Sequence, residues 1–297
     1  MNKILDRLRT KHGEKKWFLY LEELLCRYQD DDVSAMGAQL TYYLVLAIFP
    51  FLIFFFNILQ FTPLANVNVV ESLLQPLPIQ AREMLSTLLA EIMNSSNVAL
   101  LSFGAITTLF SASSGIMSII KATNKAYDLD ESRPYWKLRG LSVIFTLGLF
   151  IILVVALTIL VFGEIIVGEI FISYTWPAVI IWKIVKMLIP LVIMALMFAL
   201  LYKFAPSIKE GIEIKFKDAL PGAVFASVGL IVSSLGFSFY VNNFGKYAIT
   251  YGSLGGVIVF LIWIYITSII LVLGGELNAT IASVKGKPIN EAPEGMD

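Results

Sequence analysis

The sequence predicts an all-α, polytopic membrane bundle with six transmembrane helices, and three observations support this fold class. Of the 297 residues, 58% are hydrophobic and only 15% are charged, and the mean hydropathy is +0.80. A soluble chain carries about 25% charged residues, so this one is too apolar for a surface that faces water. Six stretches without Asp, Glu, Lys or Arg are long enough, or nearly so, for the roughly 20 residues that cross a bilayer. These features exclude a soluble enzyme, a disordered chain and a nucleic-acid-binding domain, and the net charge of zero offers no global attraction for a polyanion.

The six spans are bounded by local sequence signals. They are predicted at residues 35–60, 98–120, 138–172, 178–204, 219–243 and 253–277. Pro50 in the first span and Pro190 in the fourth predict kinks, because proline removes a helical hydrogen bond. Pro177 suits the first turn of the fourth helix, and Asp218 is a plausible N-cap for the fifth. The third span is longer than one bilayer thickness.

Two amphipathic segments are predicted outside the spans. Apolar residues between Trp17 and Tyr28 recur at helical spacing among lysines, so residues 1–32 are expected to be a cytoplasmic amphipathic segment. This helix either lies on the inner membrane face or packs on the cytoplasmic ends of the bundle. A second amphipathic stretch, between Met84 and Met93, is expected on the outer surface. Residues 33–281 then form one membrane domain, and residues 282–297 a polar cytoplasmic tail.

The distribution of positive charge predicts the orientation. Lys and Arg are concentrated in the N-terminal segment, in the loops after spans two and four, and after span six. The loops after spans one, three and five contain few of them. The positive-inside rule therefore places both termini in the cytoplasm and favours an even number of spans.

Cysteine and histidine are too scarce for most catalytic or metal sites. Cys26 is the only cysteine, so no disulfide can form within the chain. His12 is the only histidine and lies in a charged N-terminal segment, which argues against a zinc site or a Ser-His-Asp triad. We therefore expect no catalytic residues, no metal and no cofactor.

Polar residues near the cytoplasmic ends of the spans are the candidate functional residues. Glu276 follows a long uncharged run and lies in the sequence Gly-Gly-Glu-Leu-Asn. The predicted topology brings further polar residues to the same side, namely Asp218, Asn124, Asp128, Gln39 and Tyr42. Charged groups in a membrane are costly, so this gathering predicts either helix capping and hydrogen bonding between helices or a polar vestibule for a transported solute or ion.

Two other groups of residues have a structural and a functional interpretation. Folding the hairpin between spans three and four brings Glu164 near Lys183 and Lys186, which predicts a structural ion pair or, alternatively, a site for a charged ligand. Small residues are spaced for close helix packing or for lining a pore. These are Ser111 and Gly115 in span two, and Gly252 and Gly256 at the start of span six.

Several stretches resemble the YihY/BrkB family of bacterial inner-membrane proteins. They are Gly37-Ala-Gln-Leu-Thr-Tyr-Tyr-Leu, Lys121-Ala-Thr-Asn-Lys-Ala-Tyr-Asp, Phe204-Ala-Pro-Ser, Asp218-Ala-Leu-Pro-Gly, Tyr251-Gly-Ser-Leu-Gly-Gly and Gly274-Gly-Glu-Leu-Asn-Ala. The resemblance implies six spans and a plasma-membrane location. Members of the family have been described as virulence-associated and as candidate exporters. An old family label, ribonuclease BN, conflicts with this sequence, because metal-dependent RNA cleavage needs a cluster of His and Asp ligands.

The sequence leaves more than one function open. The first hypothesis is a transporter or exporter of a small solute, ion or lipid, with Glu276 as the cation or proton site and Asp218 as its partner. The alternative is a membrane scaffold or envelope-maintenance factor that transports nothing, and a lipid-modifying enzyme is the third. The expected partners are the lipid bilayer and a small solute or ion, with no nucleic acid. The sequence is also compatible with a homo-oligomer.

Overall fold

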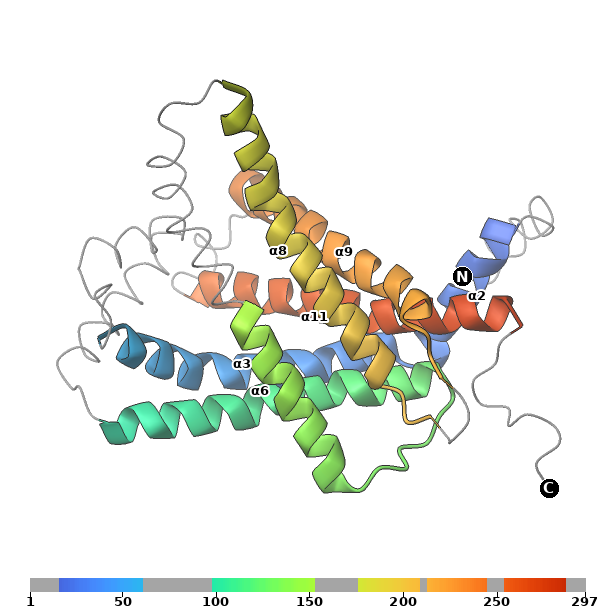
Figure 1. The fold of residues 1–297 in the computed structure, drawn as a ribbon, viewed down its shortest axis with the longest axis horizontal. Helices are drawn as coiled ribbons and strands as arrows, with labels where there is room; N and C mark the ends of the chain where they lie inside the picture. Colours follow the sequence, from blue (N-terminus) through green and yellow to red (C-terminus); the bar gives the residue numbers. More distant parts are fainter. Residues whose placement is uncertain (1–15, 61–97, 153–175, 209–212, 245–253, 287–297) are drawn as a thin grey trace.

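The computed structural model describes residues 16–60, 98–152, 176–208, 213–244 and 254–286, and these residues form helices and a few short turns, without strands. Figure 1 shows the arrangement. The helices are α2 (Lys16–Asp30), α3 (Val33–Gln60), α6 (Val98–Ala126), an unlabelled helix Tyr135–Ile152, α8 (Trp176–Phe204), α9 (Phe216–Phe244) and α11 (Leu254–Val284). The all-α prediction is confirmed.

Five of these helices are long and apolar enough to cross a membrane. They contain the candidate spans Val33–Phe54, Ser102–Ala126, Tyr135–Ile152, Phe216–Val241 and Gly255–Val284. A shorter apolar helical segment, Leu188–Phe204, lies in α8. The membrane bundle predicted from hydropathy is therefore confirmed, with five long spans and one shorter one.

The helix ends differ from the predicted ends. Helix α6 continues to Ala126 and α11 to Val284, several residues past the predicted limits of 120 and 277. The extra turns contain buried residues such as Thr123, Ala126 and Thr280, because these turns still pack against neighbouring helices. Hydropathy identifies the apolar part of each helix, but it does not predict that the polar turns after it also pack against neighbouring helices. The end of the predicted third span and the outer amphipathic stretch lie outside the described residues.

Helices α3, α6 and α11 pack lengthwise against one another (Figure 1). Helix α6 lies against α3 at Gly115, where an added Cβ would lie 3.4 Å from Leu40. Helix α11 contacts α3 at Gly37, where a Cβ would come within 2.7 Å of Ile269. These small residues let the helix backbones approach closely, as small residues do in membrane bundles.

Helices α8 and α9 lie side by side, and α9 packs closely against α11 (Figure 1). An added Cβ at Gly222 would overlap the carbonyl oxygen of Gly274 and lie 2.6 Å from Nδ2 of Asn278. The side-chain amide of Asn278 makes two hydrogen bonds to the α9 backbone, one on each side of Pro221. Gly222 N donates to Oδ1 at 2.7 Å, and Nδ2 donates to Ala219 O at 3.1 Å. The position where α9 meets α11 is therefore fixed by backbone contact and by one side chain.

Helix α2 packs against the C-terminal part of α11 and the start of α3. Phe18 is fully buried, and Tyr28 packs on a small cluster formed by Val33, Ala122 and Val272. The helix packs on the bundle, which is one of the two positions expected from the sequence, and its contact with the inner membrane face stays a prediction. The turn into α3 contains Asp32 with a positive φ of 52°.

One prediction concerns the contact between α9 and α11. Gly222→Ala places a methyl group against the Gly274 carbonyl, so we expect a loss of about 1–3 kcal/mol in the free energy of unfolding. The matched control is Gly236→Ala in the same helix, where a Cβ would meet nothing within 4 Å among the described residues. We expect that variant to be neutral or slightly more stable, because Ala favours a helix over Gly. Thermal unfolding in detergent measures both, and equal midpoints would contradict the prediction.

Candidate functional site

Five helices meet at one end of the bundle, which we call the polar end. It is formed by α2, the start of α3, the end of α6, the start of α9 and the end of α11 (Figure 1). Four of the six residues predicted for the vestibule lie here. Glu276 and Asn124 are buried, Asp218 is half-buried, and Asp128 is exposed.

The other two predicted residues do not join this group. Gln39 and Tyr42 lie on an exposed side of α3, and Tyr42 is 60% exposed. Their neighbour Leu40 is the residue that points into the core, with 1% exposure. The sequence predicted the side of the membrane but not which face of α3 is buried, and the helical repeat turns Leu40 inward and its polar neighbours outward.

Glu276 is the most unusual residue of the polar end. Its exposure is 0%, and neither of its carboxyl oxygens has a hydrogen-bond partner among the described residues. Thr280 follows one helical turn later on the same face, is also fully buried, and its hydroxyl has no partner there either. Three oxygen atoms within one turn of α11 are therefore buried without a described partner.

The two glycines before Glu276 explain how α11 brings the carboxyl into the interior. An added Cβ at Gly274 would overlap the hydroxyl of Tyr202, which donates a hydrogen bond to Leu271 O at 2.7 Å. An added Cβ at Gly275 would lie 3.2 Å from the Thr123 hydroxyl oxygen on α6. Helix α11 thus contacts α8 and α6 from two sides at this level, and the next residue is enclosed.

Charged side chains surround the buried carboxyl without bonding it. Asp31, Arg27, Lys125 and Asp128 all lie within electrostatic range of Glu276. Tyr127, which is buried, is within range of Glu276 and of Asp218. The site therefore has both signs of charge at its border and one carboxyl at its centre.

Arg27 forms its hydrogen bonds with groups other than Glu276. Its Nε lies 2.8 Å from Glu23 Oε1, and its Nη1 donates to Ala126 O at 2.6 Å. The same nitrogen is 3.9 Å from Asp128 Oδ2. The carbonyl end of a helix attracts a cation, so Arg27 stabilises the last turn of α6 and attaches α2 to it.

The surroundings shift the pKa values of two groups that lie outside the spans. Burial raises the pKa of Asp31, although the nearby Lys125 and Arg27 partly oppose this. Burial also raises the pKa of the Tyr127 phenol, and Asp218 adds to the effect. Both groups are therefore held toward their protonated forms.

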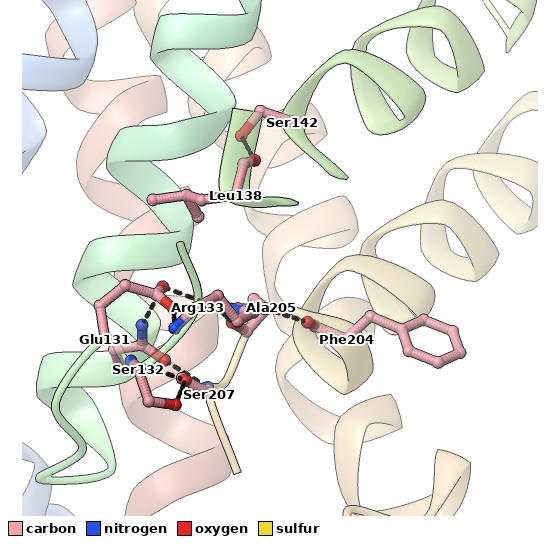
Figure 2. A network of polar contacts seen from close by, with 9 residues as sticks. Glu131, Ser132, Arg133, Leu138, Ser142, Phe204, Ala205 and Ser207 are labelled. Atoms are coloured by element: carbon pink, nitrogen blue, oxygen red, sulfur yellow. Dashed lines mark hydrogen bonds and ion pairs between the residues drawn. The ribbon is translucent and has the colours of Figure 1, made fainter. Parts of the chain in front are cut away.

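Asn124 belongs to a separate network that joins two loops (Figure 2). Its Nδ2 donates to Glu131 Oε2 at 2.8 Å, and its Oδ1 accepts from Ser207 N at 2.7 Å. Arg133 bonds Glu131 through Nε at 2.7 Å and donates to Ala205 O at 2.6 Å. The hydroxyls of Ser132 and Ser207 lie 2.7 Å apart. Figure 2 shows the hydrogen bond between them. Asn124 therefore holds the loop after α6 against the loop after α8.

The remaining predicted residues are distributed as follows. Glu164 and Gly252 lie outside the described residues, and so do the side chains of Lys183 and Lys186, whose backbone belongs to α8. Ser111 is half-buried on α6, on the same helix as the contact residue Gly115. Gly256 is exposed, and a Cβ there would meet nothing within 4 Å in the described part of the chain.

A groove of about 470 Å³ lies between α9 and α11, away from the polar end. It is lined by Ser233, Gly236, Phe237, Tyr240, Val259, Ile262 and Ile266. Its last residue on α11, Ile266, is about 15 Å along the helix from Glu276. Within the described ranges, no three His, Cys, Asp or Glu residues are placed to hold a metal ion.

Sequence reasoning missed Arg27 and Asp31. Both precede the first span, so they were assigned to a segment outside the membrane domain. The available signal was the run Asp30-Asp31-Asp32 directly before an uncharged stretch, combined with a helix long enough to reach the bundle. A carboxyl in that run has to lie at the membrane border whichever way α2 packs.

One prediction concerns Glu131. Burial alone would raise its pKa, but the hydrogen bonds from Arg133 and Asn124 outweigh it and hold the pKa below its ordinary value of 4.5. Because the folded-state pKa is depressed, the stabilisation is present above pH 4.5 and is lost as the pH falls through the folded-state value. We expect Glu131→Gln to lower the unfolding midpoint at pH 7 and to narrow its difference from wild type in acid. Glu213→Gln, an exposed carboxylate, is the control, and a difference independent of pH would contradict the prediction.

Comparisons with known proteins place the chain in a family. Residues 24–296 match the family model described as "Virulence factor BrkB". The chain is 35% identical to the Bacillus subtilis (strain 168) protein named "Putative ribonuclease-like protein YfkH", over 91% of this chain and 97% of that protein. No solved structure matches it.

Relatives with a membrane-protein name cover different parts of the chain. The UPF0761 membrane protein PSHAa0171 of Pseudoalteromonas translucida (strain TAC 125) is 33% identical over 36% of this chain and 33% of its own length. A UPF0761 membrane protein of Pseudoalteromonas atlantica (strain T6c / ATCC BAA-1087) is 23% identical over 85% of this chain and 82% of its own. With its apolar helices and a family match across most of its length, this chain belongs to the BrkB (YihY) family of bacterial multi-pass membrane proteins.

Proposed function

We propose that this protein is a transporter or exporter of a small solute, ion or lipid in the bacterial plasma membrane. In this proposal both termini are cytoplasmic, and the polar end of the bundle is a vestibule open toward the cytoplasm. In the same proposal the protein's partner is the lipid bilayer, and it binds no nucleic acid.

The buried carboxyl of Glu276 carries the proposal. A fully buried carboxyl without a described partner costs several kcal/mol if it is charged, and a helical bundle does not need one for packing. Ionisable residues inside membrane spans mark ion and substrate pathways more often than structural contacts. Charged groups at the same end, including Asp31, Asp128 and Lys125, would give a polar solute a place to gather.

The orientation is supported by charge counting rather than by geometry. The segments before the first span, after the second and fourth spans and after the sixth span contain 18 of the 22 Lys and Arg residues. The polar end is formed by parts of these segments. The positive-inside rule assigns such segments to the cytoplasm.

A second candidate function is a membrane scaffold or envelope-maintenance factor. Two observations favour it. Asn124 is used in joining two loops, and the described groove is apolar and lies away from Glu276. A bundle that only organises other membrane components would have these features without a solute pathway.

The name of the Bacillus subtilis relative refers to a ribonuclease-like protein, and we do not extend that activity to this chain. The sequence contains one histidine, and RNA cleavage by a metal-dependent mechanism needs several metal ligands. We propose that the protein is not an enzyme.

The first test is transport by the purified protein in liposomes. We expect protein-dependent flux of at least one member of a panel of inorganic ions, organic ions and fluorescent phospholipids. Glu276→Gln should reduce that flux by about tenfold or more, because it removes the ionisable group from the pathway. Glu213→Gln is the matched control, since it makes the same change at an exposed position. A folded protein that moves nothing in the panel would favour the scaffold instead.

The second test is the orientation of the polar end. Cys26 is exposed on α2 and is the only cysteine, so it is a natural label. We expect a membrane-impermeant maleimide to modify it in inverted vesicles and to leave it unmodified in intact spheroplasts. Cys26→Ser is the control for background labelling. Modification from outside the cell would contradict the proposed orientation.

A further inference from the structure

Two buried carboxyl groups that are far apart in the sequence lie together at the polar end. Glu276 on α11 is fully buried, and Asp31, at the turn between α2 and α3, is 8% exposed. Asp31 is among the charged groups that act electrostatically on Glu276. The residues on either side of Asp31 in the sequence, Asp30 and Asp32, are exposed. A series of carboxyl groups therefore runs from solvent to the interior of the bundle.

Glu276 is not held in an ion pair by the cations near it. Arg27 is bonded to Glu23 and to the Ala126 carbonyl, and Lys125 Nζ lies 3.8 Å from Asp32 Oδ2. Neither cation forms an ion pair with Glu276, whose two carboxyl oxygens have no hydrogen-bond partner among the described residues. A proton neutralises such a group with one covalent bond and needs no coordination shell. A metal cation would need several oxygen ligands.

Asp31 is suited to pass that proton in and out. It lies at the end of α2, where its own N–H donates to Arg27 O at 2.9 Å. The next residue, Asp32, has the positive φ of the turn from α2 into α3 and is exposed, so buried Asp31 is adjacent in the chain to residues that reach solvent. Its burial disfavours the charged form, as a relay group requires.

We propose that Glu276 binds and releases a proton and that Asp31 relays this proton between Glu276 and the solvent. Because neither Glu276 oxygen is hydrogen-bonded to Asp31, the transfer passes through an intervening water. In the inward step, neutral Asp31 donates its proton to this water while the water donates a proton to the Glu276 carboxylate. Asp31 is then a carboxylate and takes a proton from water at the exposed side. The outward step is the reverse. Proton binding by Glu276 does not depend on the proposed function. Only the role of the proton rests on it, because in a transporter the proton that Glu276 binds would be the coupling ion.

The charged and titratable groups around the pair come from α2, from the end of α6 and from α9. They are Arg27 and Asp30, then Lys125, Tyr127 and Asp128, and Asp218, which acts on Tyr127. Asp128 and Lys125 are accessible to solvent, so their charges are screened more than those of the buried pair.

Infrared difference spectroscopy of the full-length protein in nanodiscs tests the proposal without any transport measurement. We expect a neutral-carboxyl C=O band that titrates with pH, shifts in D2O and disappears in Glu276→Gln. Asp31→Asn should keep the band and slow its exchange in D2O by about tenfold or more. The matched controls are Glu213→Gln and Asp130→Asn, exposed carboxylates that should change neither band nor rate.

A second measurement covers the case in which Glu276→Gln does not fold. A hydrophobic carbodiimide reacts with protonated carboxyls in apolar surroundings, so wild-type protein should be modified at Glu276, as read from the peptide mass. No titrating band together with no modification would overturn the proposal. A band abolished by NaCl but unaffected by choline chloride would also overturn it, in favour of a sodium site.

These results separate the two proposals. A titrating Glu276 in a protein that moves no solute would leave the proton site intact and remove the transporter. Solute flux that is unchanged in Glu276→Gln, with no titrating band, would leave the transporter intact and remove the proton site.

Discussion

The close approach of α11 to its neighbours at Gly274 and Gly275 is the constraint on which the rest of the structure depends. At Gly274 the helix touches α9 and Tyr202 of α8, and at Gly275 it touches Thr123 of α6. No side chain larger than hydrogen fits at Gly274 without moving backbone atoms. Without an aqueous driving force between the helices, such backbone contacts and the hydrogen bonds beside them supply much of the association energy. Asn278 and Tyr202 provide those bonds at this level.

The polar groups of the bundle fall into two kinds. Asn278, Tyr202 and Asn124 are buried and fully used, each bonding backbone atoms of another element or a side chain in a connecting loop. Their desolvation is offset by the bonds they make, so they specify how helices and loops meet. The buried hydroxyls of Ser227 and Thr280 have no described partner, but a neutral hydroxyl costs far less than a charge. Glu276 combines the burial of the first kind with the missing partner of the second.

Hydropathy was enough to predict the fold class and the positions of the helices, because the oily runs and their charged borders are local properties of the chain. It could not predict where α6 and α11 end, since those turns are set by packing of Thr123 and Thr280 against other helices. The sequence predicted only some of the residues of the polar end. Glu276 was found because a carboxyl after a long uncharged run is a strong signal, whereas Asn124 was named without its structural role. Arg27 and Asp31 were missed, because their place depends on how α2 returns to the bundle, and no local pattern encodes that contact.

The bonds around Glu276 show that the carboxyl is not needed for packing. Around it, the helix ends are capped by Arg27, the loops are joined through Asn124 and Glu131, and α9 is fixed by Asn278. None of these bonds uses the carboxyl, so the packing of the polar end does not depend on its charge. A neutral side chain of similar size would satisfy the same neighbours at lower cost. A residue that breaks a local rule while its surroundings obey every other rule is characteristic of a functional group rather than a structural one. The bonds described at the polar end thus account for its packing without the Glu276 carboxyl, and this is why we propose a functional role for that group.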